Sequence, residues 1–279
     1  MKFIKKCGYS WASEESFKVY SGSTLLYTGT GFANSETRTI EQCLTTSTNN
    51  QYTVELIDSY GDSWYTGAYL AIYGQYGNIV FKNYMVEKRL ETFNISLYYG
   101  VDKDATWKMT SGSITDGWTA YSFSDSTWSD ATLGSVTATA SGTQYFRKQF
   151  VGLANMAAYD VRLYYKAGVI AYINGNEVYR DNLPDGSVSS TTAATGQYSE
   201  LAYRGFIRPG SEVASQQSIL AVELHFNSTQ TIVDFNAYLA ILATSTTEGN
   251  CFIYAESTYV TSNGGSSVTN IFDFVKSSY

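Results

Sequence analysis

The stretch VIAYINGNEVYR, residues 169–180, decides the fold class. Two runs of β-branched and aromatic residues flank the dipeptide Asn174-Gly175. Asn-Gly between such runs is a strong signal for a two-residue β-hairpin turn, because both residues accept positive φ angles. The stretch therefore predicts two antiparallel strands joined by a tight turn.

Short strand-like segments recur on both sides of this hairpin and alternate with Gly- and Ser-rich turns. They are residues 16–20, 52–57, 69–73, 93–97, 145–150, 161–165, 218–224 and 235–242. Only residues 156–159 favour a short helical turn. The pattern predicts an all-β protein with two consecutive β-sandwich, jelly-roll-like domains and a C-terminal β tail.

A polar segment at residues 100–104 interrupts the strand pattern, so we place a domain boundary there. The expected domains are a small sandwich over residues 1–100 and a jelly roll over residues 101–245. Residues 246–279 would then form a linker and strand tail, either docked as a strand or opening a truncated third domain.

The charge pattern argues against several partners. Lys and Arg number 18 and Asp and Glu 25, a formal net charge of −7, and no long basic block occurs. Such a surface repels phosphate, so we expect no nucleic-acid partner. No apolar run reaches the roughly 20 residues of a membrane helix, so we expect no membrane insertion. Residues 1–6 read as a charged stub without the apolar region of a signal peptide.

Three cysteines in a secreted chain would form one disulfide pair and leave one thiol over. Cys7 and Cys43 bracket the first strands and are the expected disulfide pair. Cys251 would remain free or bond to another chain. The alternative is three reduced thiols.

The first domain carries a recognisable turn. Residues 58–64 read DSYGDSW, after Cys43 and the strand at 52–57. This resembles the DSYGDG-type turn of a small β-sandwich module found in secreted and cell-surface proteins of bacteria and protists. Ser63 replaces the usual Gly. Asp58 and Asp62 are candidate Ca²⁺ ligands, and the alternative is that they cap turn amides.

The second domain resembles a galactose-binding-like jelly roll over about residues 104–243. The matching segments are residues 123–128, 145–148, 172–180 and 182–184. This family is appended to secreted hydrolases and surface proteins, which implies a ligand-binding fold. Ala167-Gly168 replaces the usual acidic-Gly pair, so no inherited ligand or ion site follows. The tail around residues 263–273 resembles the opening of a discoidin-like domain.

The catalytic inventory is small. His225 is the only histidine, and a nucleophilic triad or a zinc site needs more partners than it has. We therefore predict no enzyme and expect His225 to be a structural or a surface histidine.

Two kinds of surface site remain. Outward aromatics could bind a ligand by stacking, and the candidates are Tyr164, Tyr179, Tyr198 and Tyr203. The glycosylation sequons begin at Asn94 and Asn227.

These features predict a non-catalytic extracellular structural or adhesion protein, whose modules belong to a cell-surface or filament assembly. Its partners would be copies of itself, sister surface proteins or glycans. The alternative is a carbohydrate-binding ancillary module of a secreted hydrolase.

Overall fold

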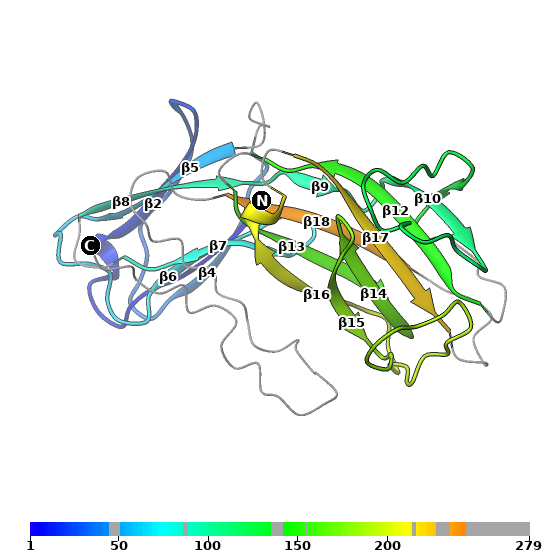
Figure 1. Cartoon of the computed structure of the whole chain (residues 1–279). Coiled ribbons are helices and arrows are strands. Elements are labelled where there is room, and N and C mark those ends of the chain that lie inside the picture. The colour runs from blue at the N-terminus through cyan, green and yellow to red at the C-terminus, as the bar shows by residue number, and fades with distance from the viewer. Residues whose placement is uncertain are drawn as a thin grey trace, which may run out of the picture. The chain divides into compact units, whose positions relative to one another are not determined.

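The computed structural model describes residues 1–44, 51–85, 89–134, 142–153, 156–213, 216–226 and 235–243. Its regular elements are β-strands and two 3-10 turns, and no α-helix occurs in these ranges. The strands form four antiparallel sheets in two sandwiches (Figure 1), so the all-β prediction is confirmed. No helix in the described ranges has the length and apolarity needed to cross a membrane. The chain divides into two compact units, Met1–Tyr98 (unit 1) and Tyr99–Ile241 (unit 2).

Unit 1 pairs two four-stranded sheets, with strand orders β4-β1-β6-β7 and β3-β2-β5-β8. Its elements are β1 (Lys2–Lys6), η1 (Ala12–Glu14), β2 (Glu15–Ser21), β3 (Thr24–Gly29), β4 (Thr37–Glu41), β5 (Gln51–Asp58), β6 (Tyr69–Tyr73), β7 (Ile79–Asn83) and β8 (Leu90–Ser96). Every second residue of β5 is buried, beginning at Tyr52, as the alternation of residues 52–57 predicts. These side chains join one apolar cluster with Phe3 and Phe17.

The segment that reads as a charged stub is strand β1, which lies between β4 and β6. Its inward positions are Phe3 and Lys5, both fully buried. The Lys5 ammonium pairs with the buried carboxylate of Glu15, and it lies 3.9 Å from the centre of the Trp64 ring. Burial lowers the pKa of Lys5, and the Glu15 carboxylate opposes that shift.

The predicted disulfide between Cys7 and Cys43 is wrong. Both thiols are free, with Cys7 buried and Cys43 exposed. The Cys7 N–H donates to the carbonyl of Glu36, whereas Cys43 follows Gln42, whose N–H donates to the carbonyl of Met1. The cysteines therefore lie at opposite ends of the β1–β4 ladder, roughly 20 Å apart at about 3.3 Å per residue. A disulfide needs Cα atoms within about 7 Å.

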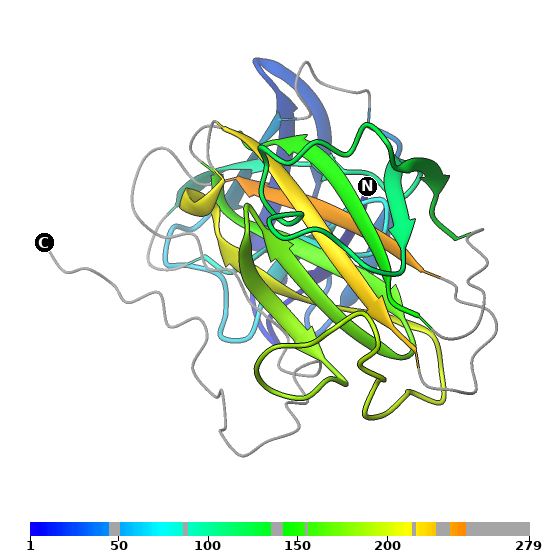
Figure 2. The same cartoon turned by 45° about the vertical axis from the view of Figure 1, so that its right-hand side comes forward.

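Unit 2 pairs a six-stranded sheet, β11-β10-β12-β17-β14-β15, with a four-stranded sheet, β16-β13-β18-β9. Its elements are β9 (Tyr99–Val101), β10 (Thr106–Ser111), β11 (Ser129–Thr132), β12 (Gln144–Val151), β13 (Met156–Tyr165), β14 (Gly168–Ile173), β15 (Asn176–Asp181), β16 (Ala202–Pro209), η3 (Gly210–Glu212), β17 (Gln217–His225) and β18 (Asn236–Ala243). Figure 2 shows the face of the six-stranded sheet that carries β14, β15 and β17.

The predicted hairpin is confirmed. Ile173 pairs with Asn176 across a turn in which Asn174 has φ of 50° and Gly175 has φ of 89°. The Asn174 side chain also accepts the Ile219 N–H at 3.0 Å, which docks the turn on β17. Both turn residues therefore have the positive φ that the dipeptide favours.

The helical turn expected at residues 156–159 is wrong, because this segment is the start of β13. Tyr159 pairs with Arg208 of β16, and its ring is fully buried with Val161 and Leu163. Burial of this alternating face against the facing sheet outweighs the helix preference of two alanines.

The two faces of the six-stranded sheet differ sharply in chemistry. Phe146 of β12 points inward, and its ring lies 4.7 Å from that of Phe235, which precedes β18. Because strand side chains alternate, Tyr145 and Arg147 point to the opposite face. Tyr145 is in register with Glu223 of β17. The outer face of this sheet is therefore lined by polar and aromatic side chains.

Candidate functional site

In unit 1, the turn after β5 gathers an acidic cluster. The carboxylates of Glu14, Asp58 and Asp62 have oxygen atoms within 4.8 Å of one another. Asp58 is buried, and its Oδ2 accepts the N–H groups of Gly61, Asp62 and Ser63 at 2.8–2.9 Å. Amide capping by Asp58, one of the two roles the sequence leaves open, is therefore observed. Calcium binding by Asp58 and Asp62 stays a prediction, to which the structure adds Glu14.

Replacing Ser63 with glycine should stabilise unit 1 by about 0.5–1 kcal/mol. Ser63 has φ of 88°, and a left-handed backbone costs a residue with a Cβ atom about 1–2 kcal/mol. The greater chain entropy of unfolded glycine offsets part of this gain. Urea denaturation measures the change. As a control, Gly61→Ala should destabilise, because Gly61 has φ of 100° and a Cβ there would meet Arg89. A Ser63→Gly variant less stable than the wild type would contradict this.

Replacing Glu14 with glutamine should raise the melting temperature in EDTA at pH 7. Loss of hydration, then the carboxylates of Asp58 and Asp62, raise the pKa of Glu14. A carboxyl group whose pKa is higher in the folded state than in the unfolded state keeps its proton to a higher pH when the chain is folded. The free energy of unfolding therefore falls as the pH rises from the unfolded-state pKa through the folded-state pKa. The gain in melting temperature should therefore vanish at pH values below the ordinary pKa of a glutamate carboxyl.

The same thermal scan with CaCl₂ tests the calcium prediction. A bound ion would stabilise the wild type more than the Glu14→Gln variant. Equal shifts in both proteins would argue against Glu14 as a ligand.

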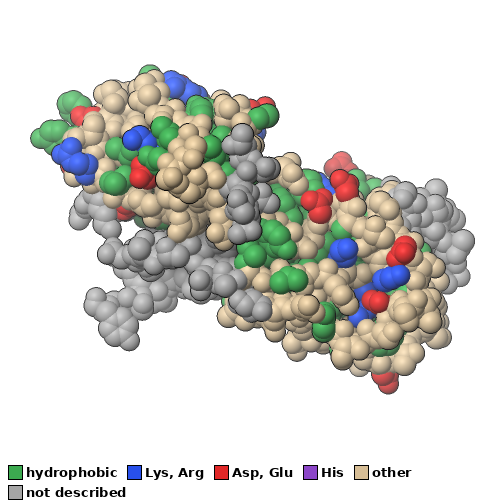
Figure 3. Space-filling view, turned by 90° about the horizontal axis from the view of Figure 1, so that it is seen from above, with side chains coloured by type: hydrophobic (Ala, Val, Ile, Leu, Met, Phe, Trp, Pro, Cys, Tyr) green, Lys and Arg blue, Asp and Glu red, His purple; other side chains and the backbone are tan. Residues whose placement is uncertain are grey.

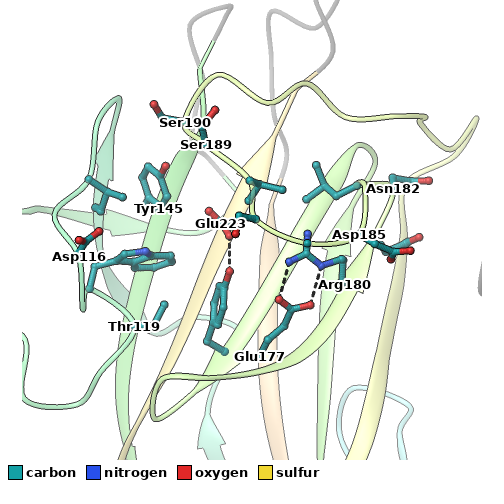
Figure 4. Close-up of a pocket in the computed structure, with 18 of the residues that line it drawn as sticks. Asp116, Thr119, Tyr145, Glu177, Arg180, Asn182, Asp185, Ser189, Ser190 and Glu223 are labelled. Carbon is teal, nitrogen blue, oxygen red and sulfur yellow. Dashed lines mark hydrogen bonds and ion pairs between the residues drawn. The ribbon is translucent and has the colours of Figure 1, made fainter.

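In unit 2, a cleft of about 1200 Å³ lies over the polar face of the six-stranded sheet. Its floor comes from Tyr145 of β12 and Glu223 of β17 (Figure 4), together with Tyr172 of β14, which bonds Glu223. One wall belongs to residues 112–128 (the first loop), which contribute Asp116, Trp118 and Thr119. The other comes from β15 and from residues 182–198 (the second loop), which contribute Glu177, Arg180, Asp185, Ser189 and Ser190.

Arg147 holds the first loop. The residue is 1% exposed, and its guanidinium forms an ion pair with Asp125 at 2.9 Å and donates to the carbonyl oxygens of Trp118, Ala120 and Phe123. It contacts all four of these residues from beneath the loop. One buried cation therefore fixes the wall that carries Trp118.

Trp118 itself packs on the floor. Its ring lies 4.9 Å from Tyr145 and 5.7 Å from Tyr172, with edge contacts in both cases. The three rings form a small aromatic cluster with Trp128 and Phe123 around it. The aromatic part of the floor is thus closely packed.

Thr143 and His225 hold the second loop. Thr143 Oγ1 donates to the carbonyl of Ser190 at 2.9 Å, and His225 Nδ1 lies 2.8 Å from the carbonyl oxygen of Thr192. His225 is fully buried. Of the two roles that the sequence leaves open for His225, structural or surface, its burial and these contacts match the structural one.

Glu223 occupies the centre of the floor. It is 5% exposed, its Oε1 accepts the Tyr172 hydroxyl at 2.6 Å, and its Oε2 lies 3.3 Å from His225 Nε2. Burial raises the pKa of Tyr172, and the hydrogen bond to Glu223 adds to that shift. Tyr172 is therefore a neutral donor at physiological pH, and the carboxylate is its acceptor.

The four tyrosines predicted to bind a ligand lie outside the lining of this cleft. Tyr164 and Tyr203 are cross-strand partners on β13 and β16, with ring centres 5.0 Å apart. Burial raises the pKa of Tyr203 to about 12. Tyr179 shares a hydrogen bond of 2.7 Å with Tyr165, and Tyr198 donates to Asp181 at 2.9 Å. Ligand binding by these four stays a prediction.

The remaining predicted sites divide into two groups. Asn94 lies within strand β8, and its Oδ1 accepts a hydrogen bond from the Thr53 hydroxyl at 3.0 Å. Glycosylation of Asn94 stays a prediction. Asn227, Cys251 and the tail from residue 244 lie outside the described residues.

Tyr145, Tyr172 and Glu223 are lining residues that the sequence predictions miss. A signal was present, because residues 219–225 read ILAVELH, with polar residues two apart in an otherwise apolar strand. That spacing places Glu223 and His225 on one face.

No family model and no curated protein matches the chain. Among solved structures, it is similar to a calcium-binding mutant of β-glucuronidase 2 from Bacteroides uniformis, with 16% identity over 52% of this chain and 18% of that chain, at a TM-score of 0.36. A β-glycosidase from Bacteroides vulgatus gives 14% identity over 52% of this chain and 20% of that chain, at a TM-score of 0.34. The chain thus spans about a fifth of each glycosidase.

A family 35 carbohydrate-binding module from Clostridium thermocellum gives 14% identity over 53% of this chain and 98% of that module, at a TM-score of 0.25. The likeness is one of β-sandwich fold.

Proposed function

We propose that unit 2 binds a carbohydrate in the cleft over its six-stranded sheet and does not transform it. The observation that carries the proposal is the lining, which combines serine and threonine hydroxyls, carboxylates and the aromatic rings of Tyr145, Tyr172 and Trp118. A sugar offers hydroxyl groups to hydrogen-bonding walls and C–H faces to aromatic rings. The walls supply the hydrogen-bonding groups, and the half-buried ring of Tyr172, packed beside the buried rings of Tyr145 and Trp118, supplies the aromatic one.

The role of the cleft in binding rather than catalysis rests on how its polar groups are used. His225 lies beneath the second loop as an anchor, and the Glu177 carboxylate is paired with Arg180 at 2.6 Å. The sequence resemblance of residues 104–243 to galactose-binding-like domains supports the same function. Such modules accompany secreted proteins, so we infer an extracellular or cell-surface location.

A glycan array with the whole chain tests the proposal. We expect binding to at least one class of saccharide, and at least tenfold weaker binding by a double variant, Asp116→Ala with Asp185→Ala. These two exposed carboxylates belong to opposite walls (Figure 4). The matched control is Asp130→Ala, an exposed carboxylate on β11 outside the lining. Absence of binding to every saccharide would overturn the proposal.

A second candidate function, adhesion between copies of this chain or to a sister surface protein, is favoured by one observation in unit 1. Tyr9, Trp11 and Tyr60 are 65–70% exposed, and the loops that carry them are joined by the Ser59 N–H donating to the Glu14 carbonyl at 3.0 Å. Exposed aromatic clusters mark interaction surfaces. Over the face that Figure 3 draws, charged side chains of both signs are scattered rather than gathered into a patch of one sign.

Sedimentation velocity tests adhesion between copies. We expect concentration-dependent association that a Trp11→Ser, Tyr60→Ser variant loses. A wild-type chain that stays monomeric at high concentration would contradict it.

A further inference from the structure

The cleft of unit 2 is strongly acidic. Its described lining holds five carboxylates, from Asp116, Glu177, Asp181, Asp185 and Glu223, and one basic side chain, from Arg180. The Arg180 guanidinium donates to both Glu177 oxygens, at 2.6 and 2.7 Å. This pairing neutralises the cation of the lining and one carboxylate. Four carboxylates are left to set the electrostatic potential of the cleft.

The partners of two of these carboxylates are neutral or weakly basic groups. Asp181 accepts the hydroxyls of Tyr165 and Tyr198. Glu223 accepts the Tyr172 hydroxyl and lies against the His225 ring. Neutral donors stabilise a carboxylate without cancelling its charge. Asp116 and Asp185 add their charges from opposite walls (Figure 4).

Glu223 has the strongest influence on a ligand at the floor, because it is almost fully buried. A charge in a poorly hydrated place interacts more strongly with its surroundings than one in water. The neighbouring tyrosine shows this influence, since burial and then the Glu223 carboxylate raise the pKa of Tyr145. A uronic acid or a sulfated sugar entering the cleft would be repelled, whereas a protonated amine would be attracted.

We propose that the cleft selects saccharides that carry a free, protonated amino group, and that Glu223 is the acceptor that distinguishes them from neutral and acidic sugars. This inference rests on the proposed carbohydrate-binding function. An ammonium group offers three donors and a positive charge to the carboxylates, while an N-acetyl group at the same position offers one donor and no charge. Hydroxyls of Thr119, Ser189 and Ser190 remain for the neutral part of the sugar ring.

Isothermal titration calorimetry with three matched oligosaccharides tests the inference: a fully deacetylated glucosamine hexamer, its N-acetylated counterpart and an oligogalacturonate. At a pH below the amine pKa, the glucosamine hexamer should bind the whole chain at least tenfold more tightly than the acetylated one, and oligogalacturonate should bind weakest. A hydrogen bond to a charged group is worth about 1.5–3 kcal/mol, which corresponds to about 10- to 100-fold.

Two variants locate the effect. Glu223→Gln should reduce the preference for the amine, measured as the ratio of the two hexamer affinities on the same variant, to within about twofold. A loss of binding common to both hexamers leaves that ratio unchanged. Glu200→Gln, an exposed carboxylate outside the lining, should bind as the wild type does. Circular dichroism checks the fold of each variant. Independently of any variant, wild-type affinity for the glucosamine hexamer should fall with added NaCl, and affinity for the acetylated hexamer should not.

The outcomes separate the inference from the proposed function. Equal or tighter binding of the acetylated or acidic oligosaccharide would overturn selectivity for amines and leave carbohydrate binding in place. A preference that survives in Glu223→Gln would overturn the role of Glu223. If none of the three oligosaccharides binds, the inference is overturned, and the glycan array then decides the proposed function.

Discussion

Replacing Arg147 with methionine should destabilise unit 2 by about 3–5 kcal/mol and remove ligand binding in the cleft. The buried guanidinium pairs with Asp125 and donates to three carbonyl oxygens of the first loop. Removing one partner of a buried charged network leaves the others without compensation, which is costly. Without the cation the first loop no longer has a fixed position, and Trp118 no longer closes one wall.

The adjacent residue supplies the control. Lys148 points to the other face and donates to the Thr106 carbonyl at 2.9 Å, so Lys148→Met should change stability by less than about 1 kcal/mol. Urea denaturation gives the stabilities, and hydrogen exchange of residues 112–128 reports on the loop. An Arg147→Met variant with wild-type exchange in that loop would contradict the anchoring role.

Replacing Lys5 with methionine should destabilise unit 1 by about 3–5 kcal/mol, because it leaves the Glu15 carboxylate buried without its cation. Glu15 retains the Gly8 N–H as a donor at 3.1 Å, which satisfies one oxygen. The contact of the ammonium with the Trp64 ring is lost as well. Urea denaturation measures the loss, and hydrogen exchange of β1 and β2 assigns it to unit 1.

The double variant Lys5→Met, Glu15→Gln should recover a large part of that stability. Glutamine keeps an acceptor for the Gly8 N–H and removes the buried charge, so no ion is left unpaired. Replacement of a whole buried pair is often close to neutral. A double variant as unstable as the sum of the two single variants would show that the ion pair is not the source of the effect.

Much of unit 2 follows from local sequence. Asn174-Gly175 fixes the hairpin, and alternation fixes the inward faces of β12 and β17. Strand β1 could not be predicted from the sequence, because one of its two inward positions is Lys5. A lysine is expected to be exposed unless its buried partner, here Glu15, is known. That partner lies on the facing sheet, so only tertiary packing reveals it.

The candidate site can be predicted from the sequence only in part, because loops form its walls. Alternation places Glu223 and His225 on one face, but it does not show that this face is covered. The coverage depends on Arg147 holding the first loop and Thr143 holding the second. The predicted tyrosines illustrate the same limit, since Tyr164 and Tyr179 form pairs with other tyrosines and do not line the cleft.

The most direct test of carbohydrate binding is a crystal structure of the whole chain with the saccharide that binds most tightly on the array. We predict electron density for the sugar over Tyr145, Tyr172 and Glu223, between the first and second loops, with any amino group within hydrogen-bond distance of the Glu223 carboxylate. Density for the sugar elsewhere on the protein, with this cleft empty, would contradict the account.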